Sequence, residues 1–144
     1  MAIDGNRCRT RSRIHSSPLW SVELPLGWSS SEESECTSFC GHPILGILQA
    51  SAVQKPDGEI TQADIMEFAE ESQAHCICSK TVHTDRYFGT RCESERSGIS
   101  WTEWWLAWSS TLVYFTYNVP AVEKTREIGQ VEAIINSLII GADD

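Results

Sequence analysis

Two neighbouring segments rich in β-forming residues constrain the fold of this chain more than any other feature. Residues 99–108 contain four tryptophans, and residues 112–117 form a run of apolar, β-branched and aromatic side chains. The tryptophans recur at helical spacing, so periodicity alone favours a helix in the first segment. The β propensity of Trp, Ile and Thr, and the turn residues Ser109 and Ser110, favour a strand. We therefore expect a β-hairpin, with a helix over residues 99–108 as the alternative.

Local patterns predict the remaining elements. Thr61 can cap a helix over residues 61–73, in which Ile65, Phe68, Ala69 and Ser72 are expected to form a narrow buried stripe. A second amphipathic helix is expected over residues 121–139. This order of elements predicts an α+β fold in which a mainly antiparallel sheet of about six strands packs with two helices. Polar loops are expected at residues 29–35 and 93–98. Further strands are expected at residues 19–25, 36–40, 44–54, 76–82 and 86–92.

Charge is distributed unevenly along the 144 residues. Residues 1–16 show no periodic pattern and include four arginines, so we expect a flexible, Arg-rich arm there. Residues 17–144 are expected to form a single α+β domain, since one domain usually has about 100–200 residues. The net charge is −9, and an acidic body repels phosphate backbones, which argues against nucleic acid as the main partner.

The sequence also bears on compartment and thiol chemistry. The N-terminus lacks the apolar core of about 7–15 residues that a secretory signal needs, which favours a cytoplasmic location. No run approaches the ~18 apolar residues of a membrane helix. Six cysteines are present, and without a visible export signal we expect them to be reduced thiols rather than a disulfide framework.

One group of residues has the right chemistry for zinc. Thiols and imidazoles occur together at His75, Cys76 and Cys78, with His83 downstream. The spacing lacks the second paired knuckle of structural zinc sites, so we expect buried thiols on one face of a strand and no metal. Catalytic motifs are absent from the sequence, and the glutamate pairs lie in polar contexts. The sequence therefore favours a non-enzymatic protein without a cofactor.

The tryptophan segment supplies the candidate binding residues. On a strand, Trp101, Glu103 and Trp105 share one face, and Tyr117 and Asn118 lie on the companion strand. If helices cover both faces, these aromatic residues belong to the core. If one face is open, they form an aromatic patch with a charge, which is typical of a binding hot spot.

Several segments together resemble small bacterial proteins of unknown function with the PsbP-like fold. That superfold also includes a photosystem II extrinsic subunit, an import factor that binds the GTPase Ran, and adaptors of type VI secretion effectors. The resemblance covers roughly residues 17–140 and implies an antiparallel sheet between helices and binding of macromolecules rather than catalysis. It carries no common active site, so no functional residue transfers. The segments are residues 20–28, 48–51, 101–108, 116–118 and 131–138.

These observations predict a non-enzymatic protein–protein interaction module of bacterial type, with an adaptor, chaperone-like or immunity-like role. Its acidic body suits a partner protein with a basic or mixed surface, and a homodimer is left open. The alternative is a small-molecule-binding domain or minor enzyme that holds a ligand between sheet and helix near the tryptophan cluster.

Overall fold

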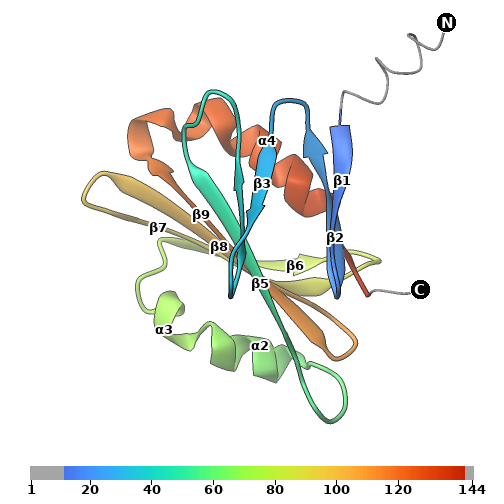
Figure 1. Ribbon diagram of the computed structural model, residues 1–144. Helices are drawn as coiled ribbons and strands as arrows, with labels where there is room; N and C mark the ends of the chain where they lie inside the picture. Colours follow the sequence, from blue (N-terminus) through green and yellow to red (C-terminus); the bar gives the residue numbers. More distant parts are fainter. Residues whose placement is uncertain (1–11, 142–144) are drawn as a thin grey trace, which may run out of the picture.

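The computed structural model describes residues 12–141 and contains two antiparallel sheets. The seven-stranded sheet dominates the molecule, and a three-stranded sheet lies beside it (Figure 1). In spatial order, the large sheet comprises β3 (Ser29–Glu32), β4 (Thr37–Cys40), β5 (Ile47–Gln54), β9 (Thr111–Pro120), β8 (Ile99–Trp108), β7 (Phe88–Arg96) and β6 (Cys78–His83). The small sheet comprises β1 (Ser12–Ser17), β2 (Trp20–Pro25) and β10 (Ile139–Ile140).

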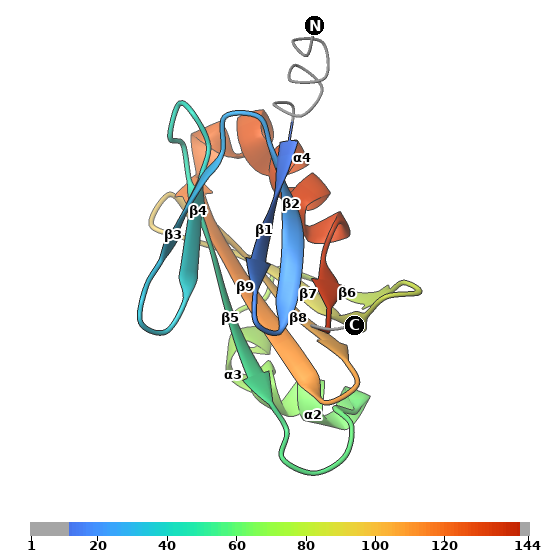
Figure 2. The same ribbon diagram turned by 45° about the vertical axis from the view of Figure 1, so that its right-hand side comes forward.

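Short helices and one long helix complete the described part of the chain. They are α2 (Gln62–Phe68), α3 (Glu70–Gln73), the 3₁₀ turn η1 (Ala121–Glu123) and α4 (Lys124–Asn136). Helix α2 begins with a capping box, in which Thr61 and Asp64 satisfy each other's backbone amides. Helix α4 lies on one face of the large sheet, and α2 and α3 lie on the other (Figure 2).

The predicted hairpin is confirmed: β8 and β9 pair antiparallel along their length. The helical spacing of the tryptophans arises because both faces of β8 are covered near its end. Trp104 lies in the core under α4, and Trp105 lies in the core under α2; both are buried. A strand that is buried on both faces loses its alternation of apolar and polar residues. This explains why the tryptophans of residues 99–108 recur at helical spacing although they lie on a strand.

The predicted α+β fold is confirmed, but several details were wrong. The large sheet has seven strands rather than six because the polar segment expected as a loop contains β3. Strand β7 continues to Arg96, and the first helix is divided at Ala69. Helix α4 ends at Asn136, after which β10 pairs with β2.

The N-terminal boundary also differs from the expectation. Strand β1 begins at Ser12, within the range expected for the arm, and pairs with β2 from Ser12 to Ser17. Its residues show no continuous alternation of apolar and polar side chains, so the sequence contains no periodic signal for a strand there. The rest of the predicted arm, residues 1–11, lies outside the described residues.

Two hydrophobic cores hold the layers together. The larger one lies between the large sheet, α4 and the small sheet and includes the fully buried Trp104, Tyr117 and Phe115. The smaller one lies under α2 and includes Ile65, Ala69 and Trp105. Because α2 and α3 are short, they cover only part of their face of the sheet, and the remaining part is where a site can form.

Candidate functional site

The structure separates the five predicted binding residues into two groups. Trp101 lies opposite Asn118 across the β8–β9 ladder, and Glu103 lies two residues from Trp101 on the same face. All three are half-buried. Trp105 shares this face but is only 4% exposed beneath α2, and Tyr117 is 1% exposed on the opposite face. Trp101, Glu103 and Asn118 therefore remain accessible together, whereas Trp105 and Tyr117 belong to the two cores.

A hollow of about 280 Å³ opens on this face, where the sheet emerges from beneath α3. We call it the sheet hollow. Strands β7, β8 and β9 form its floor, and α3 with the following turn forms one wall. The residues that line it are Glu71, Ser72, His75, Ser94, Arg96, Trp101, Glu103, Tyr114 and Thr116.

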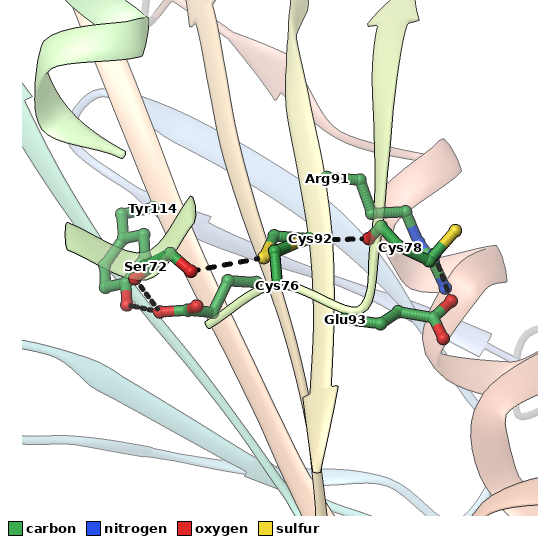
Figure 3. Close-up of a disulfide and its surroundings, with 8 residues drawn as sticks. Ser72, Cys76, Cys78, Arg91, Cys92, Glu93 and Tyr114 are labelled. Atoms are coloured by element: carbon green, nitrogen blue, oxygen red, sulfur yellow. Dashed lines mark hydrogen bonds and ion pairs between the residues drawn. A yellow bond between two sulfur atoms is a disulfide. The ribbon is translucent and has the colours of Figure 1, made fainter. Parts of the chain in front are cut away.

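Glu103 is the centre of the hydrogen bonding in the sheet hollow. The Tyr114 hydroxyl donates to Glu103 Oε2 at 2.5 Å, and the Ser72 hydroxyl donates to the same oxygen at 3.2 Å. Figure 3 shows Ser72 and Tyr114 side by side. Within residues 12–141, Glu103 Oε1 has no hydrogen-bond partner. One carboxylate oxygen is thus held in place while the other is available to a donor from outside.

Burial raises the pKa of Tyr114 above its usual value of 10.0, and the hydrogen bond to Glu103 and its charge raise it further. The phenol therefore stays protonated near neutral pH and acts as a permanent donor to the carboxylate. A general base needs a pKa near the working pH. The Tyr114 hydroxyl thus orients the Glu103 side chain by donating to it, and Tyr114 itself is poorly suited to proton abstraction.

Trp101 and Arg96 form the aromatic end of the sheet hollow. The Arg96 guanidinium lies 5.6 Å from the centre of the Trp101 ring, a cation–π distance. Arg96 is exposed and Trp101 is half-buried. Glu71 and His75 are exposed at the opposite wall. The hollow thus combines an aromatic surface that already holds one cation with a carboxylate that has an unused oxygen.

A disulfide between Cys76 and Cys92 connects the turn after α3 to β7 beside this hollow, with the two Cα atoms 5.7 Å apart (Figure 3). The prediction of reduced thiols was therefore wrong for this pair. Cys36, Cys40 and Cys78 are free, whereas Cys8 lies outside the described residues. Pairing of Cys76 with Cys92 is non-local, so the local sequence patterns held no signal for it.

The structure separates the weak zinc candidates. Cys76 precedes β6 and is bonded to Cys92, whereas Cys78 lies with Arg91 and Glu93 on the opposite side of the sheet (Figure 3). The expectation that the two sulfurs share one face was wrong because strand alternation begins only at Cys78. Among residues 12–141, no three His, Cys, Asp or Glu side chains gather as metal ligands.

Sequence reasoning missed several members of the sheet hollow. Ser72 was placed on the buried stripe of the first helix. Because a buried hydroxyl needs a hydrogen-bond partner, that position could have indicated a contact such as the one with Glu103. Tyr114 was not among the predicted binding residues. Arg96 and Thr116 had no signal, because their contribution depends on the strand register.

Comparisons with known proteins identify a fold and no family. No protein-family model matches the chain, and no curated protein matches it. A protein from Bacteroides thetaiotaomicron VPI-5482 superimposes with a TM-score of 0.68 at 14% identity, over 92% of this chain and 50% of that one. Cyanobacterial PsbP (CyanoP) from Synechocystis sp. PCC 6803 superimposes with a TM-score of 0.56 at 10% identity, over 92% of this chain and 94% of that one.

The chain thus has a PsbP-like fold, as the resemblance predicted. It spans half the length of the Bacteroides protein. None of the helices in the described part of the chain has the length and apolarity to cross a bilayer.

Proposed function

We propose that this chain is a non-enzymatic protein-binding module whose sheet hollow receives a lysine or arginine side chain of its partner. The observation that carries the proposal is the half-satisfied carboxylate of Glu103 beside the Trp101 ring. Carboxylates and aromatic faces are the two groups that attract a cationic side chain. Adaptor, chaperone-like and immunity-like roles would each use such a surface.

The charge of the whole molecule supports the same partner. A net charge of −9 speeds the encounter with a basic surface and slows it with an acidic one. Arg96 lies over Trp101 at the mouth of the hollow, so an incoming cation would contact Glu103 and displace the exposed Arg96 side chain from the ring. Release of this flexible side chain costs little, because surface contacts of this kind contribute only about 0.5–1 kcal/mol.

The alternative of a small-molecule ligand is less well supported by the same geometry. Pockets for drug-sized ligands usually measure about 300–1,000 Å³ and enclose most of the ligand. The sheet hollow measures about 280 Å³ and opens onto the uncovered part of the sheet, where half-buried Asn118 and Gln49 continue the surface. A side chain delivered by a partner fits this site better than a free ligand does.

A peptide-display selection on the immobilised protein tests the proposal. We expect selected peptides to be enriched in lysine and arginine, and the enrichment to disappear on Glu103→Gln, which keeps an oxygen acceptor for Tyr114 and Ser72 but removes the charge. Glu95→Gln is the matched control, because Glu95 is exposed on β7 outside the hollow. Selection of acidic or purely apolar peptides, unaffected by Glu103→Gln, would contradict the proposal.

The location of the protein is a further part of the proposal. The sequence predicts the cytoplasm, whereas the Cys76–Cys92 disulfide is typical of oxidising compartments. We favour an oxidising compartment for the binding-competent protein. Titration of free thiols in protein alkylated at the moment of cell lysis tests this: protection of Cys76 and Cys92 supports an oxidising location, and alkylation of both supports the cytoplasm.

A further inference from the structure

Three hollows follow one another along α2 and α3, and neighbouring hollows share lining residues. The first, of about 600 Å³, is lined by the end of β5 and by α2, and it shares Glu67 and Phe68 with a second of about 500 Å³. The second shares Glu71 and His75 with the sheet hollow. We call the whole feature the helix-side groove. It extends the surface around Glu103 well beyond the space that one side chain can fill.

The end of the groove farthest from Glu103 is apolar. Val53 is 46% exposed and Phe68 is 52% exposed, and both line it together with the buried Ile60. The first helix was expected to bury Phe68, but the division of the helix at Ala69 leaves this ring largely in solvent. Two large apolar side chains exposed around one hollow are typical of a docking position for an apolar residue.

The middle of the groove is acidic. Glu67, Glu70 and Glu71 line it, and none of them forms an ion pair within residues 12–141. The cations along the groove are already engaged, Lys55 with Asp64 at 2.9 Å and Arg96 with the Trp101 ring. The groove thus presents uncompensated negative charge to whatever enters it, which favours a basic occupant.

The strand register gives the distance between the two ends. Val53 lies opposite Leu112, and Thr116 of the sheet hollow is four residues further along β9. Four residues of strand span about 13 Å. An extended segment lying along β9 covers this distance in about four residues, and residues i and i+4 of an extended chain point to the same side. Glu103 lies opposite Thr116 on the next strand, and the long side chain of a lysine or arginine spans the remaining strand spacing of about 4.8 Å.

We propose that the helix-side groove binds an extended segment of a partner protein in which one large apolar residue and one lysine or arginine are about four residues apart. The apolar residue occupies the Val53–Phe68 end, and the cation reaches Glu103. This inference rests on the proposed function and adds to it the partner's apolar residue and the spacing. The acidic middle of the groove selects a segment without Asp or Glu between the two anchors.

Fluorescence anisotropy with short synthetic peptides tests the spacing. Acetyl-LSGSR-amide and its reverse, acetyl-RSGSL-amide, place leucine and arginine four residues apart, and we expect at least one to bind about 10-fold more tightly than acetyl-ASGSR-amide, a difference of about 1.4 kcal/mol. Peptides in which the two positions are two or eight residues apart should lose this gain. Equal affinities across all spacings would overturn the inference.

Variants of the apolar end provide the second arm of the test. Val53→Ser and Phe68→Ser should each lower the affinity of the four-residue peptide toward that of acetyl-ASGSR-amide and leave acetyl-ASGSR-amide itself unchanged. Val122→Ser is the matched control, because Val122 is 87% exposed on η1 and lies outside the groove. A loss in the control as large as that in Val53→Ser would overturn the inference.

The two proposals fail in different ways. In the first case, acetyl-ASGSR-amide binds and Glu103→Gln abolishes its binding, but the leucine-containing peptides bind no more tightly. Only the helix-side groove inference is then wrong. If arginine contributes nothing, the proposed function is wrong as well. Concentration-dependent self-association of the full chain, abolished by Val53→Ser, would identify a second copy as the occupant and overturn the partner assignment.

Discussion

At the scale of single residues, a buried carboxylate holds the larger core in place. Glu127 on α4 is only 2% exposed. Its Oε1 atom accepts hydrogen bonds from the Tyr117 hydroxyl at 2.8 Å and from the Gly46 amide at 3.1 Å. A side chain at Gly46 would approach the Asn118 carbonyl to 2.6 Å, so glycine is required for this contact. One side chain thus connects α4, β9 and the segment before β5.

Two substitutions of Glu127 distinguish the contribution of its hydrogen bonds to stability from the contribution of its charge. Glu127→Gln keeps an oxygen that can accept both bonds, so we expect a loss of less than about 1.5 kcal/mol in the free energy of unfolding. Glu127→Ala leaves two buried donors without a partner, and we expect a loss of about 2–5 kcal/mol. Urea denaturation measures both. A loss with glutamine equal to that with alanine would show that the charge, and not the acceptor, is required.

The tyrosines give a second prediction at this scale. Burial raises the pKa of all three tyrosines above 10.0; the hydrogen bonds of Tyr114 and Tyr117 to carboxylates add to the effect. Since the folded pKa exceeds the unfolded pKa, the stabilisation is fully present below about pH 10 and is lost as pH rises through the folded values.

Spectrophotometric titration of the phenol groups tests this expectation. In the folded protein, ionisation should be delayed to higher pH than in guanidinium-unfolded protein, and the unfolding free energy should decline above about pH 10. Tyr114→Phe should weaken that decline. Coincident titration curves for the folded and unfolded protein would show that the tyrosines are not shielded in this way.

At the scale of elements, the sequence predicted what local patterns encode and missed what depends on pairing. The capping residue Thr61 and the hairpin of β8 and β9 were correct because both signals are local. Strand β3 was missed because its residues are exposed or half-buried at the sheet edge and show no alternation. Strand β10 was missed because Ile139 was assigned to the end of the preceding helix, although Ile139 and Ile140 pair with β2.

The disulfide joins two of these elements, and its removal should reduce stability. Cys76 and Cys92 are 16 residues apart in the sequence, and a disulfide closing a loop of about 15 residues stabilises by about 3 kcal/mol. We expect Cys76→Ser to lower the free energy of unfolding by roughly this amount. Cys78→Ser is the control, because Cys78 is exposed and free; it should change stability by less than about 0.5 kcal/mol. Equal effects of the two variants would argue against the Cys76–Cys92 bond.

Helix α4 carries a further prediction about stability. Gly129 lies within it, and a side chain at that position would meet no other atom within 4 Å. Gly129→Ala should therefore raise the free energy of unfolding by about 0.8–1 kcal/mol, since alanine favours the helix. Gly89→Ala is the contrasting variant, because its Cβ would lie 1.7 Å from the Trp105 carbonyl oxygen, and it should destabilise strongly. A thermal melt in which both variants behave alike would contradict this account.

At the scale of the whole molecule, incomplete coverage of the large sheet creates the candidate site. Helix α4 and the small sheet cover one face, whereas α2 and α3 cover only part of the other (Figures 1 and 2). The sequence predicted that Trp101 and Glu103 share a face with Trp105. It could not predict which of them a short helix would cover, because that depends on how α2 and α3 lie across the strands.

The central claim is that a basic segment binds on the face carrying α3, β8 and β9. Amide chemical-shift mapping of the isotope-labelled protein, titrated with acetyl-LSGSR-amide, tests it most directly. The account predicts that the largest shifts cluster at Ser72, Trp101, Glu103 and Thr116 and that Glu103→Gln abolishes them. Shifts clustered on α4 or on the three-stranded sheet, unaffected by Glu103→Gln, would contradict it.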